Sequence, residues 1–310
     1  MIKQSKVSGL AEASRRPYSP ADRQQALSGW LFSLPFVLVF LVFMIGPLIA
    51  SFAMSFTDFR ATDVRNPFAV NFVGLRTYTD LFRDDRFLQS LKVTGLFALL
   101  GIPCAIAAAL VLAVALNNGI SRCQTLFRVG FYAPVVTSIV AVSVVWRYIL
   151  QPSGLLNGIL LTIGITGPNW LHSTFWALPS VTLLAIWRNV GTLMIIFIAG
   201  LQSIPKEIIE ASSIDGAGAW RRFFSIKLPI LRPTILLGTI LISVAFLQFF
   251  EESFVMTQGG PLDSTLSISY YTYSKFGQGQ YATASAAAYI LFLIIALFGI
   301  GQFRVLEKKG

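Results

Sequence analysis

The chain has 310 residues, of which 55% are hydrophobic and 12% are charged, and its mean hydropathy is +0.70. Because about 25% charged residues is usual for a soluble domain, this composition excludes an ordinary soluble protein and predicts a polytopic membrane protein. The formal net charge is +10. The cysteines, Cys104 in an apolar run and Cys123 in a short polar loop, predict neither a disulfide framework nor a metal site.

The chain begins with a polar, basic segment, residues 1–29, which has no apolar periodicity and is expected to form an N-terminal tail. Apolar runs long enough to cross a bilayer as tilted helices follow at about 30–56, 91–116, 129–150, 176–201, 234–256 and 282–303. Residues 155–165 are also apolar, but this run is only about half a bilayer long, so we expect a helix in the membrane interface. The sequence therefore predicts an all-α polytopic protein with six transmembrane helices over residues 30–303 and a short tail, 304–310.

The distribution of charge predicts the orientation. If the N-terminus is cytoplasmic, the predicted inside segments carry a large excess of Lys and Arg, whereas cations and acids balance in the outside segments. This is the positive-inside pattern, so both termini and the loop 202–233 are predicted to be cytoplasmic. The basic excess is then an orientation signal and a contact for lipid headgroups. Nucleic-acid binding would need a soluble basic face, and we expect none.

The loop 202–233 contains the one long polar stretch between the apolar runs of the second half. A helix is predicted from Pro205 to about Asp215, with Gly216 supplying the positive φ that commonly ends a helix. A second, basic and aromatic helix begins near Trp220 and is expected to end before Pro229, because the residue ahead of a proline is pushed out of the α region. We therefore expect a helix, a glycine turn and a second helix between two membrane spans.

This loop contains a spaced set of residues: Glu210-Ala211, Asp215-Gly216-Ala217, Ile226, Leu228-Pro229 and Pro233. The set resembles the EAA loop of the membrane permeases of binding-protein-dependent ABC importers, in which the loop is a cytoplasmic coupling helix that sits in a groove of the ATPase subunit. Ser212 stands where a second Ala is usual, and its small size preserves a close approach. The resemblance implies that the following residues couple to an ATPase: Glu207, Glu210, Ala211, Asp215, Gly216, Ala217, Leu228 and Pro229. For Glu210 we expect contact with a cation of the ATPase, although an acid also suits a helix N-terminus by itself.

The resemblance extends over nearly the whole chain after the tail. Segments similar to carbohydrate-type permeases occur in the family's order: Ser55-Phe56-Thr57-Asp58, Asn71-Phe72-Val73-Gly74-Leu75, Gly154-Leu155-Leu156-Asn157, Gly200-Leu201-Gln202-Ser203-Ile204-Pro205 and Thr257-Gln258-Gly259-Gly260-Pro261. The last loop resembles the maltose and glycerol-phosphate type of subunit, which pairs with a second, different permease. The resemblance implies a type I ABC importer (MetI-like) fold in the bacterial cytoplasmic (inner) membrane, a heterodimer of permeases, two ATPase subunits and an extracytoplasmic solute-binding protein that docks at Gly259, Gly260 and Pro261.

The residues indicate no catalysis by this chain. No G-x-x-x-x-G-K-[ST] phosphate-binding motif occurs, so we expect ATP and Mg to bind to the partner ATPase subunits and no cofactor to bind here. His172 is the only histidine; it falls in a predicted outside loop and is interpreted as an ordinary interface residue.

Charged residues within the predicted spans are candidates for the solute pathway, because an ionised side chain deep in a helix costs about 2.5–3.5 kcal/mol. Helical spacing places the polar residues of the fifth run, Gln248, Glu251 and Glu252, on one side of the predicted helix. The fourth run contains the polar stretch Trp187, Arg188 and Asn189. The hypothesis is that these two sets of residues line the solute pathway. The alternative is a structural Arg–Glu pair. Two acids against Arg188 favour a neutral sugar or polyol over a phosphate ester. A small neutral sugar is the expected substrate, and an importer of the same type for a polyol or glycerol-phosphate-like solute is the alternative. An ion-coupled secondary transporter is the other class of function kept open.

Overall fold

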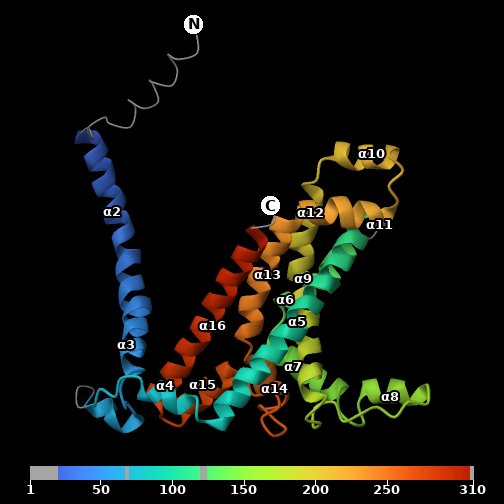
Figure 1. Cartoon of the computed structure of the whole chain (residues 1–310). Helices are drawn as coiled ribbons and strands as arrows, with labels where there is room; N and C mark the ends of the chain where they lie inside the picture. Colours follow the sequence, from blue (N-terminus) through green and yellow to red (C-terminus); the bar gives the residue numbers. More distant parts are fainter. Residues whose placement is uncertain (1–19, 67–69, 119–123, 308–310) are drawn as a thin grey trace. The chain divides into compact units, whose positions relative to one another are not determined.

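The computed structural model describes residues 20–66, 70–118 and 124–307 and divides into two compact units, Met1–Ala53 and Met54–Gly310 (Figure 1). Most of the predicted N-terminal tail lies outside the described residues, although helix α2 begins at Pro20, ten residues before the predicted first span. Part of the predicted tail 304–310 is also helical, because α16 continues to Glu307.

Unit 1 is one long helix, composed of α2 (Pro20–Phe40), the π-helical turn η2 (Leu41–Ile45) and most of α3 (Gly46–Met54). In the π turn the N–H of Gly46 donates to the carbonyl of Leu41, five residues earlier, and Pro47 follows directly. None of the most apolar residues between Leu27 and Met54 is buried. A helix that is apolar all round is typical of a membrane span.

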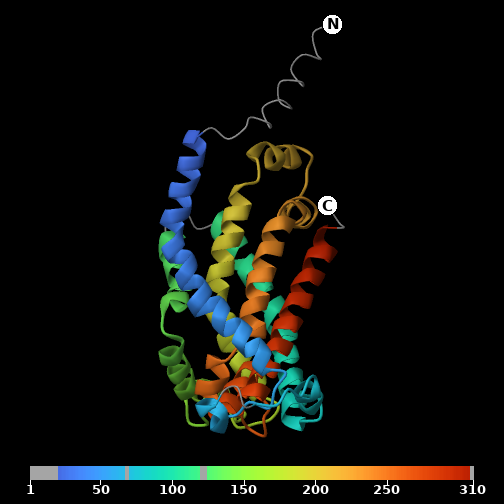
Figure 2. The same ribbon diagram turned by 90° about the vertical axis from the view of Figure 1, so that its left-hand side faces the viewer.

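Unit 2 contains the other elements. In chain order they are η3 (Ala61–Arg65), α4 (Arg76–Leu81), α5 (Asp85–Asn118), α6 (Gln124–Val136), α7 (Ile139–Ile149), α8 (Leu155–Thr162), α9 (Ala177–Gln202), α10 (Lys206–Ile214), α11 (Ala219–Arg222), η4 (Phe223–Lys227), α12 (Leu228–Ile230), α13 (Arg232–Leu247), α14 (Glu251–Met256), α15 (Ile268–Gly277) and α16 (Tyr281–Glu307). The long helices α5, α9, α13 and α16 run alongside one another. Helix α10 lies beyond one end of this bundle, the α10 end, and α4, α8 and α15 lie at the other, the α15 end (Figure 2).

The core of unit 2 is the packing of α5 against α9 and α13. Ala105, Ala109 and Ala113 are fully buried at four-residue intervals on α5, and such small side chains let helix backbones approach closely. Nearer the α15 end, the ring of Phe97 stacks on that of Phe249 with the centroids 3.8 Å apart. Helices α15 and α16 form a smaller apolar cluster with the first turns of α5.

The predicted spans 91–116, 176–201 and 282–303 correspond to the long apolar helices α5, α9 and α16. The predicted run 129–150 is instead two helices, α6 and α7, bent by 101°. Pro134 cannot donate to the carbonyl four residues earlier, and Ser138 then adopts an extended conformation before α7 begins.

The predicted continuous run 234–256 is also wrong, because α13 ends at Leu247 and α14 begins at Glu251. The residues between them leave the helical path so that Phe249 can be buried against Phe97. The Ser269 hydroxyl donates to the carbonyl of Gln248 and satisfies the end of α13.

The second helix of the polar loop does not end before Pro229, as predicted. It continues through η4 and α12 to Ile230 and only then bends by 70° into α13. In η4 the N–H of Leu228 donates to the carbonyl of Phe223, five residues earlier. This wider turn admits a proline that an α-helical turn would exclude, and the same arrangement precedes Pro47.

The crossing of α6 and α9 gives a direct test of the packing. A Cβ on Gly191 would meet the carbonyl oxygen of Phe131 and would lie 3.0 Å from the Cα of Tyr132. We expect Gly191→Ala to destabilise the protein by about 1–3 kcal/mol, as overpacking does, and to lower the Tm of the purified membrane protein. Gly95→Ala is the control, because a Cβ there meets nothing within 4 Å. Equal Tm values for the two variants would contradict the close approach.

Candidate functional site

The end of α10 has the geometry predicted for it. The N–H of Ala217 donates to the carbonyl of Ser212 and the N–H of Gly216 to that of Ser213, and Gly216 has a φ of +74°. This pair of hydrogen bonds around a left-handed glycine is the Schellman motif. Ser212 is the buried residue of α10, and its hydroxyl donates to the carbonyl of Ile209 at 2.7 Å. The buried hydroxyl of Ser212 therefore has a hydrogen-bond partner within α10.

The rest of α10 is exposed. The carboxylates of Glu207 and Glu210 have no ion-pair partner within 4.0 Å among the described residues, and the apolar side chain of Ile214 is 88% exposed. Glu210 also lines a cavity of about 340 Å³ beneath the helix, together with Lys206 and Lys227. Ile208 is exposed as well, so α10 presents two acids and two apolar side chains at its surface.

Helix α10 is joined to the bundle at several points. It follows α9 after three residues, Ser203–Pro205, and the guanidinium of Arg222 donates to the hydroxyl of Ser213 at 2.7 Å. This bond links α10 to α11, which continues towards α13. A displacement of α10 would therefore act on both α9 and α13.

At the α15 end, residues 257–266 form an ordered loop, here called the 257–266 loop. The hydroxyl of Thr265 donates to the carbonyl of Gly260 at 2.9 Å and lies 2.6 Å from the hydroxyl of Thr257. Gly259 is buried with a φ of +80°, and the peptide bond from Gly260 to Pro261 is cis. The predicted docking residues thus shape the inside of the loop. The exposed tip is Leu262, whose side chain is 88% exposed.

Charged groups that are distant in sequence hold this loop. The guanidinium of Arg86, in the first turn of α5, donates two hydrogen bonds of 2.9 Å to the carboxylate of Asp263. Asp263 raises the pKa of Arg86, as expected for a fork-shaped pair. The sequence alone does not indicate this pair. The equal numbers of cations and acids in the outside segments were the only available signal, and they do not indicate partners.

A second ionic contact lies beside the first. The carboxylate of Asp84 accepts a hydrogen bond of 2.7 Å from the hydroxyl of Tyr271 and lies 3.2 Å from the ammonium of Lys275. Partial burial raises the pKa of Asp84, but the Tyr271 hydroxyl and the Lys275 ammonium together lower it below its ordinary value. Burial and the neighbouring carboxylate raise the pKa of Tyr271, so this hydroxyl stays protonated and acts as a donor.

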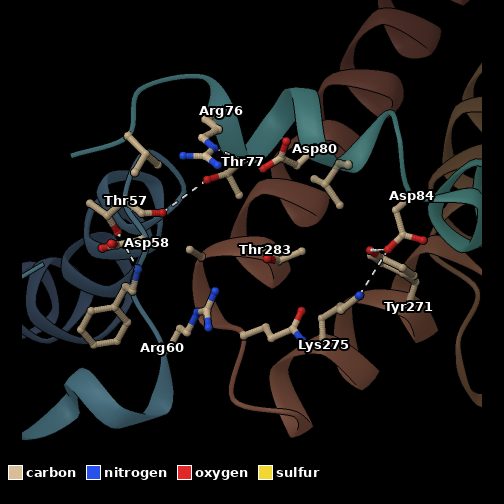
Figure 3. A pocket seen from close by; sticks show the side chains of 15 residues that line it. Thr57, Asp58, Arg60, Arg76, Thr77, Asp80, Asp84, Tyr271, Lys275 and Thr283 are labelled. Carbon is tan, nitrogen blue, oxygen red and sulfur yellow. Dashed lines mark hydrogen bonds and ion pairs between the residues drawn. The ribbon is translucent and has the colours of Figure 1, made fainter. Parts of the chain in front are cut away.

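These groups line part of a polar cavity of about 510 Å³ (Figure 3). Its other wall carries Asp58, which accepts hydrogen bonds from the side chain and backbone of Asn71 at 3.0 and 2.9 Å. These bonds lower the pKa of Asp58. Arg60 and Thr283 point into the space between the two walls. The cavity is lined by both cations and acids, among them Arg60, Lys275, Asp58 and Asp84.

The candidate pathway residues come from contacting elements, since α14 packs against both α7 and α9. The indole of Trp187 lies 5.6 Å from that of Trp146, centroid to centroid. The amide of Asn189 donates to the carbonyl of Ala185 in its own helix. The Nε of Arg188 is buried and has no hydrogen-bond partner, and within the described chain no ion pair of 4.0 Å joins Arg188 to Glu251 or Glu252.

The expected helical stripe of Gln248, Glu251 and Glu252 is not present, because the helix is interrupted between Leu247 and Glu251. Glu251 and Glu252 form the first turn of α14, with Glu251 exposed and Glu252 only 5% exposed. Gln248 is an exposed residue at the end of α13. The two glutamates therefore face different surroundings.

The described residues contain no group of three or more His, Cys, Asp and Glu side chains able to hold a metal ion. His172 lines a small cavity with Arg147 and Pro261 near the 257–266 loop. The residues that line this cavity include no Asp or Glu.

Two apolar bent pairs and four long apolar helices, with α10 and the 257–266 loop at opposite ends of unit 2, define a multi-pass membrane subunit that can contact partners on both sides. Residues 100–309 match the family of binding-protein-dependent transport system inner membrane components, and the chain belongs to this family.

Individual relatives agree with this assignment. The chain is 35% identical over 307 residues to the lactose transport system permease protein LacF of Rhizobium radiobacter, covering 97% of this chain and 100% of the relative. It is 34% identical to the arabinooligosaccharides transport system permease protein AraP of Bacillus subtilis over 89% of both chains.

The fold is shared with solved structures. A chain of a bacterial ABC transporter involved in the import of the acidic polysaccharide alginate superposes with a TM-score of 0.77 at 25% identity, over 93% of this chain and 98% of that one. A chain of the alginate transporter in complex with its alginate pentasaccharide-bound periplasmic protein gives 0.75 at 27% identity, over 95% and 99%.

We expect the Arg86–Asp263 ion pair to restrain the 257–266 loop. Asp263→Ala should speed amide hydrogen exchange in this loop several-fold, because one bidentate contact is lost and because Ala tolerates the φ of +56° at this position less well than Asp. Loss of the pair itself should change the overall stability by only about 0.2–1 kcal/mol, since it is partly exposed. The control is Asp80→Ala, which removes a single contact of 3.8 Å between exposed side chains on α4. Unchanged exchange in the loop of Asp263→Ala would show that its internal hydrogen bonds suffice.

Proposed function

We propose that the chain is the permease subunit of an ATP-driven importer of a small neutral sugar, and that it forms half of the translocation pathway. The family assignment and the sugar-transport relatives support the general function. The observation that carries the coupling part of the proposal is α10, an exposed helix with acidic and apolar side chains that is attached to both α9 and α11. Its partners in this proposal are two ATPase subunits, which bind ATP and Mg, and a second homologous permease.

In this proposal α10 transmits the motion of the ATPases. Glu210 meets a cation of the ATPase, and Ile214 fills an apolar recess beside it. When the ATPase pair closes, α10 moves, and its attachments to α9 and α11 rock the membrane helices between outward-open and inward-open arrangements. The α10 end is then cytoplasmic, together with both termini.

The α15 end is then the outer surface, where the solute-binding protein docks. The 257–266 loop offers Leu262 as an apolar tip, and the cavity around Asp58 and Lys275 offers paired charges beside it. An apolar anchor with a polar surround is a common arrangement at interfaces between proteins. Gly259, Gly260 and Pro261 contribute by fixing the shape of the loop.

Trp187, Arg188, Asn189, Gln248, Glu251 and Glu252 are proposed to line the pathway, where aromatic rings stack on sugar faces and polar groups bind hydroxyls. The buried Nε of Arg188 without a partner supports a polar ligand in this region. A polyol or glycerol-phosphate-like solute is the alternative substrate. Ion-coupled transport through Glu251 and Glu252 is the alternative mechanism. Under this mechanism α10 would have no role in transport.

The coupling proposal predicts that Glu210→Ala weakens binding of the ATPase. Truncating one partner of a buried charge pair costs about 2–5 kcal/mol, so the ATPase that co-purifies with the tagged chain should fall by about ten-fold or more. The measurement is quantitative mass spectrometry of the complex, mildly solubilised from its native membrane. Asp80→Ala, which removes an acid at the opposite end of unit 2, should retain the ATPase. Recovery of the parent chain alone would reject the importer proposal.

The pathway proposal predicts that Glu252→Gln changes sugar uptake by about ten-fold, since a hydrogen bond to a charged group contributes about 1.5–3 kcal/mol. Uptake of two different sugars is measured in vesicles that contain equal amounts of assembled complex. A changed rate or a changed ratio between the sugars at normal complex yield supports contact with the solute. Loss of the assembled complex would assign Glu252 a structural role instead.

A further inference from the structure

A large apolar groove runs along the α10 end of unit 2. It has a volume of about 800 Å³. One wall is the last part of α5, where Ala107, Val111 and Ala115 present small or branched side chains. The other wall is the helix Ala219–Ile230, and two of its cations, Arg222 and Lys227, lie on the groove's margin. We call this feature the basic–aromatic groove.

Two aromatic residues of the groove, Trp220 and Phe224, are exposed. Trp220 is 77% exposed and stacks on Phe224, with the ring centroids 5.8 Å apart and the planes 8° from parallel. Because they are four residues apart, both rings lie on the same face of the helix. Large aromatic side chains that remain in water are unfavourable, whereas Trp is enriched where a membrane meets water.

The direction of the helix places this face at the boundary of the membrane. Residues Ala219–Ile230 are bent by 70° from α13, which is apolar enough to belong to a membrane span. The helix therefore runs more nearly along the membrane surface than across it. It lies at the level where α5 and α9 end, whereas α10 lies further out (Figure 1). This is the position of an interfacial amphipathic helix.

The two charged residues that line the groove, Arg222 and Lys227, are both cations, whereas Glu210 lies in the adjoining cavity that Lys227 also lines. Arg221, Arg222, Lys227 and Arg232 lie on or beside this helix, and residues 216–250 include no Asp or Glu. One arm of the Arg222 guanidinium is fixed on the Ser213 hydroxyl, which holds the side chain at the margin. Two cations that line an apolar groove match a ligand with an anionic head and a hydrocarbon tail.

We infer that the basic–aromatic groove binds an anionic phospholipid. The phosphate contacts Arg222 and Lys227, an acyl chain lies over the small side chains of α5, and Trp220 covers the glycerol region. This site is lined by none of the residues proposed for the solute pathway, and it adjoins α10 through Ile209. It rests on the membrane location of the chain and not on the solute or on ATPase coupling.

The test uses the intact complex, solubilised in a mild detergent from vesicles of phosphatidylglycerol and phosphatidylcholine. Native mass spectrometry counts the phosphatidylglycerol that is retained. Arg222→Gln should lower retention by about five-fold, the effect of one basic residue at a membrane surface. Arg221→Gln removes the same charge from the neighbouring exposed residue, which does not line the groove, and should retain the lipid.

Two further variants separate lipid binding from folding. Ser213→Ala removes the attachment of Arg222 to α10 but keeps the cation, so it should retain most of the lipid. Val111→Trp fills the groove and should release phosphatidylglycerol even though every cation is present. Equal retention by Arg222→Gln and Arg221→Gln would overturn the inference. A photoreactive residue at position 111 that captures another subunit instead of a phospholipid would also overturn it and would make the groove a subunit interface.

Discussion

The close packing of α5 against α9 is the constraint on which the other features of unit 2 depend. It is made by small residues on α5, among them Ala105 and Ala109, and it fixes two long helices over most of their length. Arg86 in the first turn of α5 holds the 257–266 loop, and the last turns of α5 form a wall of the basic–aromatic groove. Helix α9 leads directly into α10. A loss of packing between these helices would therefore alter the surfaces at both ends.

The two ends of unit 2 use charge differently. At the α15 end, cations and acids are paired with one another, as in Arg86 with Asp263 and Lys275 with Asp84, so this end is ordered by its own ion pairs. At the α10 end, Glu207 and Glu210 of α10 are exposed and have no ion pair within 4.0 Å in the described part of the chain. An end that satisfies its own charges presents a preformed surface, whereas an end with outward charges depends on partners for their neutralisation.

The sequence predicted the features that depend on local chemistry. Apolar runs of membrane length, the end of α10 at Gly216 and the short helix after Gly154 were all predicted from composition and spacing. The breaks at Ser138 and Gln248 were not predicted, because apolar length alone does not show where a buried ring such as Phe249 draws the chain out of its helix. The continuation through Pro229 was missed because a π turn leaves no signal in the sequence. Pairs such as Arg86 with Asp263 depend on contacts between distant segments.

The helix of unit 1 has a consequence for how the protein is made. Its residues are apolar on every side, so a bilayer is a suitable environment for all of its faces. Its insertion during synthesis does not have to wait for later helices. Helix α9, in contrast, carries Arg188 within its length, and its insertion becomes favourable only when neighbouring helices surround that charge. Biogenesis of this protein is therefore expected to begin with an independent anchor and to end with a cooperative step.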